Sequence, residues 1–138
     1  MDSVSYFGED VGTEVDSVDL DAGTLTLTFI ATDDHITDAG TLDEGLVATI
    51  ADNNTSTLLA VFGTAKGGSV ATSVSVSLSV QACAAIAPNT PVEVICKVTN
   101  PQLSHPHALA TFRSTTDPAI VYAVCGHTKF AKDVLGKL

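Results

Sequence analysis

One stretch of this sequence has the apolar spacing of a long α-helix, and it limits the fold more than any other feature. Apolar residues recur at three- and four-residue steps from Leu42 to Phe62, which places them on one face of a helix. Thr41 and Glu44 have the spacing of a capping box, and Gly63 is suited to end the helix. The sequence therefore predicts one helix of about five turns over 42–62.

The rest of the chain is patterned as β-strands. Between Thr72 and Val80, serines alternate with Val and Leu, as in a strand that buries one face. A further strand fits before Gly23. Turn-forming residues separate four more β-rich runs, at 24–30, 92–98, 108–113 and 120–125. This order predicts an α+β fold, an antiparallel sheet of five to six strands wrapped around one long central helix.

Length and charge exclude several classes of function. The 138 residues predict a single domain over 1–138, with an acidic segment at 1–22. The formal net charge of −10 disfavours nucleic-acid binding, and no apolar run reaches the roughly 18 residues of a membrane span. The first ten residues lack the features of a transit peptide, so we expect a cytoplasmic protein, with a mitochondrial location left open.

Cysteine and histidine spacing argues against disulfides and metals. The chain has three cysteines, an odd number, at Cys83, Cys96 and Cys125. They have no CxxC spacing and lie in apolar segments, which predicts reduced, buried thiols. The four histidines lack metal-ligand spacing, so no metal is expected. No serine lies in a GxSxG context, so a hydrolase triad is not expected either.

Acidic residues concentrate just before the predicted helix and recur once inside it. Asp43 and Glu44 suit the helix dipole, and Glu44 would close the cap on Thr41. Asp52 and its two following asparagines interrupt an apolar helix, so Asp52 either faces solvent or serves a function. The densest polar cluster of the chain comprises Asp33, Asp34, His35, Thr37, Asp38, Asp43 and Glu44.

Two motifs resemble those of the hotdog-fold acyl-CoA thioesterases, of the phenylacetate-pathway and superfamily-member-13 types. In that family H-x-N is followed by G-x-x-H-G-G and by an acid seven residues after the last glycine. His35 to Asp52 has the same spacing. Gly126-His127-Thr128-Lys129 resembles the terminal G-x-H-T-K motif, here without the x. The resemblance covers about 24–129.

The resemblance implies a hotdog fold and hydrolysis of acyl thioesters at a site shared between two subunits of a homodimer or tetramer. Coenzyme A would enter as part of the substrate, with no separate cofactor. Asp52 then matches the catalytic base, Ser73 a serine that orients water, and Gly45 the second glycine of the motif. The residues expected to bind coenzyme A are His127, Lys129 and Lys66.

Three residues depart from the family motif. Thr37 stands where the family has asparagine, Asp43 where it has histidine, and Glu44 where it has a glycine whose N–H polarises the thioester carbonyl. A carboxylate about 4 Å from the developing oxyanion would cost up to about 4 kcal/mol. Two alternatives to hydrolysis therefore stay open. One is a degenerate hotdog protein that binds an acyl or apolar ligand or a structural partner. The other is a dehydratase- or isomerase-type enzyme that uses Asp43 or Glu44.

Overall fold

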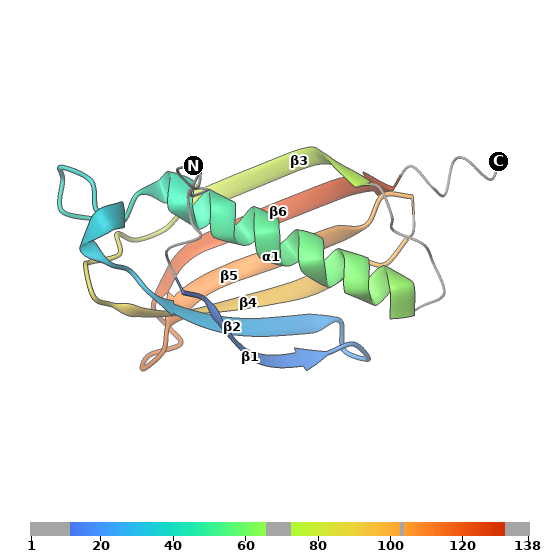
Figure 1. Ribbon diagram of the computed structural model, residues 1–138, viewed down its shortest axis with the longest axis horizontal. Helices are drawn as coiled ribbons and strands as arrows, with labels where there is room; N and C mark the ends of the chain where they lie inside the picture. The colour runs from blue at the N-terminus through green and yellow to red at the C-terminus, as the bar shows by residue number, and fades with distance from the viewer. Residues whose placement is uncertain (1–11, 66–72, 103, 132–138) are drawn as a thin grey trace, which may run out of the picture.

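The structure is a computed structural model that describes residues 12–65, 73–102 and 104–131. This part of the chain forms a six-stranded antiparallel sheet and one long helix (Figure 1). A short 3-10 helix, Asp33–His35, precedes the long helix. The other elements are β1 (Glu14–Asp19), β2 (Thr24–Ile30), α1 (Glu44–Ala65), β3 (Ser73–Ala82), β4 (Pro91–Asn100), β5 (His107–Ser114) and β6 (Val121–Ala131).

The sheet has the strand order β1-β2-β4-β5-β6-β3, and α1 lies across one face of it (Figure 1). β1 confirms the strand that fits before Gly23. The predicted bounds of β2 agree with the structure, whereas β6 continues six residues beyond its predicted end at Cys125. The added residues include the polar segment 126–129, whose composition does not indicate a strand. The predicted α+β architecture is confirmed.

The core lies between α1 and the inner face of the sheet. Alternate residues of β2, β4 and β5 point inward, as expected of strands with one covered face. Phe29 and Phe112 meet edge to face at 6.2 Å between ring centroids. From α1, one apolar stripe faces the sheet, comprising Leu46, Val47, Ile50, Ala51, Leu58 and Leu59. This packing holds α1 in a fixed register against the strands, so polar residues on the same helix face are also enclosed.

β3 differs from its sequence-based prediction. Its Ser/Val alternation predicts one buried face, yet Val74, Val76 and Leu78 are 57 %, 59 % and 39 % exposed. β3 lies at the edge of the sheet, and among the described strands it pairs with β6 alone. A register shift between Ser75 and Ser77 makes a bulge, and a bulge changes which face later residues occupy. Strict alternation in the sequence therefore does not correspond to strict alternation in space.

The helix begins two residues later than predicted and has a different cap. The Gly45 N–H donates to Asp43 Oδ1 at 2.7 Å, so Asp43 caps the helix in the manner common for aspartate. The prediction that Thr41 and Glu44 form a capping box is wrong. Both Thr41 and Asp43 are good caps in sequence terms, and the backbone decides between them. Leu42 donates its N–H to Ile86 O at 2.8 Å, which fixes the approach to the helix.

The cysteines confirm the thiol prediction in part. All three are free. Cys96 and Cys125 are buried, and burial raises their pKa values to about 12 and about 11, respectively. Such thiols stay protonated and inert at neutral pH. Cys83 is exposed, because it follows β3 at the sheet edge, and its predicted burial is wrong.

We expect Asp43→Ala to lower the free energy of unfolding by about 1 kcal/mol, because the Gly45 amide loses its acceptor. Thr41→Ala is the matched control and should change stability less. Urea denaturation at neutral pH measures both variants. A larger loss for Thr41→Ala would contradict the assignment of the cap to Asp43.

Candidate functional site

Polar side chains from α1, β3 and β6 converge on His127. The His127 side chain has 0 % exposure. Its Nδ1 lies 2.8 Å from Thr55 Oγ1 on α1, and its Nε2 lies 2.7 Å from Ser75 Oγ on β3. Asp52 Oδ1 lies 3.7 Å from the same Nε2. One imidazole thus connects the helix to the edge strand.

The hydrogen-bond network assigns the His127 tautomer. The Thr55 hydroxyl donates to Ala51 O at 2.6 Å, so its single proton is used and its oxygen accepts from His127 Nδ1–H. In the neutral ring, Nε2 then carries a lone pair. The Ser75 hydroxyl donates to that nitrogen. His127 is therefore placed as a proton acceptor toward Ser75.

A second branch of the network connects Asp52 to Lys129. Ser56 Oγ donates to Asp52 Oδ1 at 3.3 Å, and Lys129 Nζ donates to Ser56 Oγ at 3.1 Å. The Asp52 side chain is 44 % exposed, so its carboxylate stands at the solvent end of the network. Ser56 thus bridges the Lys129 ammonium group and the Asp52 carboxylate, which form no direct ion pair.

Electrostatics favours a neutral His127. Burial lowers its pKa below the ordinary value, and Lys129 and His107 act in the same direction, while the Asp52 carboxylate raises it. The ring therefore stays neutral at physiological pH. A neutral ring is what the Ser75 hydrogen bond requires.

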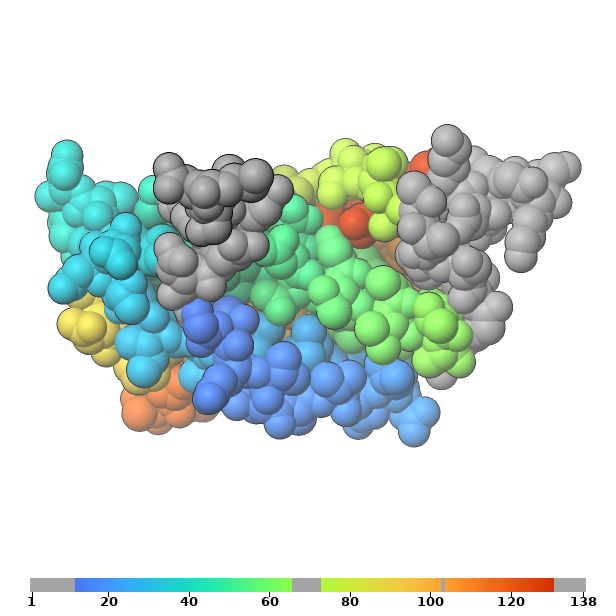
Figure 2. Space-filling view, viewed as in Figure 1, coloured from blue at the N-terminus to red at the C-terminus, as the bar shows by residue number. Residues whose placement is uncertain are grey.

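The site lies where α1, β3 and β6 meet. Figure 2 shows atoms of the C-terminal part of β6, in red, between the green atoms of α1 and the yellow-green atoms of β3. Ser75 itself is exposed on the edge strand. Solvent therefore reaches Ser75 and the Asp52 carboxylate, whereas His127 is buried.

The structure brings three of the predicted site residues together. Asp52, His127 and Lys129 share one network although they come from α1 and the last strand. Thr55, Ser56 and Ser75 were not predicted as site residues. The available signal was helical spacing, since residues three and four positions after Asp52 lie on its side of the helix.

Other predicted residues lie at the N-terminal end of α1. Thr37 Oγ1 donates to Thr41 O at 3.1 Å within an exposed loop. The Gly45 N–H donates a hydrogen bond to the Asp43 carboxylate. Asp52 is the eighth residue after Glu44 on α1, which corresponds to a rise of about 12 Å along the helix axis. The predicted site is therefore divided between two places within one chain.

Ser73 and Lys66 complete the predicted set. Ser73 is half-buried at the first position of β3, opposite Ala131. It lies two residues before Ser75, which is the serine that contacts His127. Lys66 lies outside the described residues.

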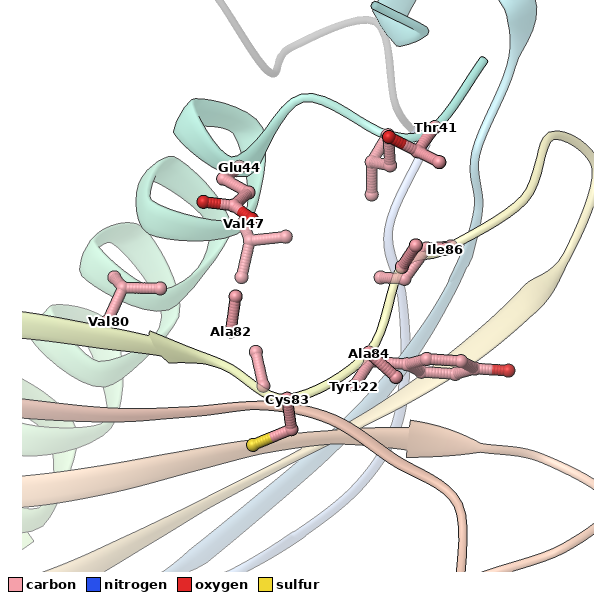
Figure 3. A pocket seen from close by; sticks show the side chains of 12 residues that line it. Thr41, Glu44, Val47, Val80, Ala82, Cys83, Ala84, Ile86 and Tyr122 are labelled. Atoms are coloured by element: carbon pink, nitrogen blue, oxygen red, sulfur yellow. The ribbon is translucent and has the colours of Figure 1, made fainter. Parts of the chain in front are cut away.

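Glu44 lines a cavity of about 260 Å³ beside the helix N-terminus. Figure 3 shows Glu44 and Val47 on the helix side of this cavity, with Val80, Ala82 and Cys83 along the strand side. The surrounding side chains are mostly apolar and small. An acyl-sized apolar group fits such a space, with one carboxylate at its edge.

Comparison with known proteins identifies the fold. No protein-family model and no curated protein matches the sequence. Zebrafish thioesterase superfamily member 2 matches in structure with a TM-score of 0.73 and 19 % identity, over 86 % of this chain and 80 % of that one. The chain has the hotdog fold. The hotdog fold predicted from the motif resemblance is confirmed.

Two further hotdog structures have similar scores. Phenylacetic acid degradation protein PaaI from Thermus thermophilus has a TM-score of 0.69 and 18 % identity, over 90 % of this chain and 96 % of that chain. A protein from Streptococcus pneumoniae named as a hypothetical thioesterase and solved with coenzyme A has a TM-score of 0.73 and 11 % identity, over 86 % of this chain and 84 % of that chain. At these identities the likeness establishes the fold.

The described residues offer neither a membrane-spanning helix nor a metal-binding cluster. No helix within 12–65, 73–102 and 104–131 is long and apolar enough to cross a membrane. In the same part of the chain, no group of three or more His, Cys, Asp or Glu is placed to hold a metal ion.

We expect stability to fall as the pH drops below the ordinary pKa of histidine. Because the folded pKa of His127 is lowered, the unfolded state binds its proton first, and protonation favours unfolding. The contribution is fully present above the unfolded pKa and is lost as pH falls toward the folded value. Urea denaturation between about pH 7.5 and pH 5.5 measures this slope.

The control for this prediction is a substitution at a residue that does not titrate. His127→Gln should flatten the slope, whereas Asn53→Ala, at an exposed position, should leave it unchanged. The charged groups near His127 are Asp52, Lys129 and His107, and all three remain in both variants. An unchanged slope in His127→Gln would show that other groups cause the pH dependence.

Proposed function

We propose that this hotdog protein hydrolyses acyl thioesters of the acyl-CoA class, with Asp52 as the general base. The observation that carries the proposal is the position of the Asp52 carboxylate. It is partly exposed at the solvent end of a buried polar network on the central helix. Its spacing from Gly45 also matches the thioesterase motif. Similar folds that are named thioesterases, one of them solved with coenzyme A, support the substrate class.

In the proposed reaction, Asp52 takes a proton from a water molecule that attacks the thioester carbonyl. The C–S bond then breaks, and the thiolate leaves with a proton. The developing oxyanion needs N–H donors, which a helix N-terminus supplies. The Glu44 amide is the proposed donor. The Gly45 N–H donates a hydrogen bond of 2.7 Å to the Asp43 carboxylate. It can act as a second oxyanion donor only after this hydrogen bond has broken.

This mechanism requires two subunits. Glu44 and Asp52 are about 12 Å apart along one helix, too far to act on one carbonyl. We therefore propose a homo-oligomer in which the helix N-terminus of one subunit meets Asp52 of another. The exposed apolar residues of the edge strand β3 support this proposal, since an unpaired, apolar edge favours pairing with another chain.

Coenzyme A would bind near Lys129. Its phosphates need a cation in a chain whose net charge is −10. Lys129 supplies one, and it is half-buried beside Ser56. His127 has no exposed surface, so we assign it no direct contact with coenzyme A. Lys66 stays a candidate from the sequence alone.

The cavity beside Glu44 favours a second candidate function. A carboxylate at the edge of an apolar space can act as an acid or base on a bound metabolite, or can simply border a ligand site. The repurposed enzyme and the degenerate binder both use this cavity. Both differ from the thioesterase in needing no contribution from Asp52.

We expect Asp52→Asn to reduce acyl-CoA hydrolysis by about two to four decades, the usual contribution of a general base. Release of free thiol from a panel of acyl-CoAs measures the rate. Asn53→Ala, at the exposed next residue, is the control and should keep full activity. Full activity in Asp52→Asn would exclude Asp52 as the base. Absence of hydrolysis in the native chain, with an acyl ligand still bound, would favour the binding protein.

We expect light scattering to show a dimer or tetramer at micromolar concentration. Val76→Lys places a charge on the exposed edge strand and should weaken association by at least about tenfold. Val15→Lys is the control, because Val15 is equally exposed, at 59 %, on the opposite edge strand β1. A monomeric native chain would eliminate the shared site, and equal effects of the two variants would eliminate β3 as the interface.

A further inference from the structure

The direct role of Asp52 as a base makes no use of the contact between Ser75 and His127. We propose that Ser75 is an acyl-accepting nucleophile and that His127 is the base that activates it. The Ser75 hydroxyl lies 2.7 Å from His127 Nε2, within the range required of a nucleophile and its base. The natural acyl donor is the thioester of the proposed function, and to that extent this inference rests on it.

Thr55 prepares the imidazole for this role. Its hydroxyl proton is committed to Ala51 O, so its oxygen can only accept from Nδ1–H. This contact fixes the ring orientation and leaves the Nε2 lone pair directed at Ser75. Thr55 is 1 % exposed, so water does not compete for the bond. Thr55 is therefore a positioning residue.

Asp52 is placed to stabilise the charged ring. When Nε2 takes the proton from Ser75, the new positive charge lies 3.7 Å from Asp52 Oδ1. The carboxylate favours that charge, whereas the buried site alone disfavours it. In a Ser-His-Asp triad the carboxylate lies on the other ring nitrogen. Here a threonine occupies that position, and the carboxylate serves as counter-ion beside the transferred proton.

The proposed step is balanced without a co-reactant other than water. Ser75 Oγ attacks the acyl carbonyl carbon as its proton passes to His127 Nε2. The C–S bond breaks, and the leaving thiolate takes the proton from Nε2, which leaves an ester on Ser75. Water then attacks this ester, gives its proton to Nε2, and releases the acid as Ser75 Oγ regains a proton.

The bulge in β3 distinguishes Ser75 from the later serines of the strand, because it changes which face of the sheet they occupy. Ser75 lies opposite Lys129 and faces α1 through its bond to His127, whereas Ser77 lies opposite Thr128 after the register shift. Ser79 lies on the other face, where its Oγ is 3.3 Å from the position that a Cβ on Gly126 would occupy. Ser79 is therefore a matched control on the same strand.

The test uses the full chain and p-nitrophenyl acetate, an activated ester that contains no coenzyme A. We expect a burst of p-nitrophenolate equal to the protein concentration, and one acetyl group on Ser75 by peptide mass spectrometry. Ser75→Ala should lose both signals, and Ser79→Ala should keep both. His127→Gln should slow the burst by about two to four decades.

Thr55→Val tests the same role of His127 if His127→Gln fails to fold. Thr55→Val keeps the side-chain shape but removes the acceptor for Nδ1–H, so it should slow acetylation while leaving Ser75 the acetylated residue. Circular dichroism verifies the fold of each variant. Acetylation at other residues, or equal bursts in Ser75→Ala and the native chain, would overturn the proposal.

The outcomes separate this inference from the proposed function. Acetylation of Ser75 without acyl-CoA hydrolysis would support the nucleophile and refute the thioesterase. Acyl-CoA hydrolysis at the same rate in Ser75→Ala and the native chain, with no acetyl group on Ser75, would refute the nucleophile and support direct attack by water.

Discussion

The packing of α1 against the sheet requires every polar group enclosed between them to have a partner. His127 of β6 meets this requirement although it is buried, and an unpaired ring there would cost several kcal/mol. Thr55 and Ser75 each take one of its nitrogens, at 2.8 Å and 2.7 Å. Because one partner is on the helix and the other on the edge strand, the same two bonds that satisfy the ring also position Ser75 and Asp52. The packing of the helix on the edge strand and the proposed chemistry therefore both depend on the His127 side chain.

The edge position of β3 gives this strand two roles. Its outer residues remain exposed, which leaves an edge suited to a second chain. Its bulge turns Ser75 toward α1 and Ser79 to the opposite face. Without the bulge, Ser75 and Ser79 would share one face, because side chains alternate along a regular strand. The irregular register is thus what makes one serine chemically distinct.

The sequence was sufficient for the fold, and it named three of the residues that meet around His127. Periodicity located α1 and β2 well, because their apolar faces pack directly on the core. It failed for β3, whose Ser/Val alternation contains no sign of a bulge, and for the cap, where Thr41 and Asp43 are equally suitable residues. Asp52 and His127 followed from motif resemblance. Helical spacing from Asp52 was a signal for Thr55. Ser75 had no such signal, because hydroxyl residues are common in the chain and the histidine that it contacts lies 52 positions away.

The contacts around His127 give Asp52 different tasks in the serine route and in direct attack by water. Ser56 donates to Asp52 Oδ1 and accepts from Lys129 Nζ, so these two bonds hold the carboxylate in place beside the ring. The imidazole lies within hydrogen-bond distance of the Ser75 hydroxyl, and the carboxylate, 3.7 Å from Nε2, acts as the counter-ion of the protonated ring. Asp52 thus contributes to the serine route by keeping its charge, whereas it gives up that charge when it acts as the base itself. Only the serine route makes use of the 2.7 Å contact between Ser75 and His127.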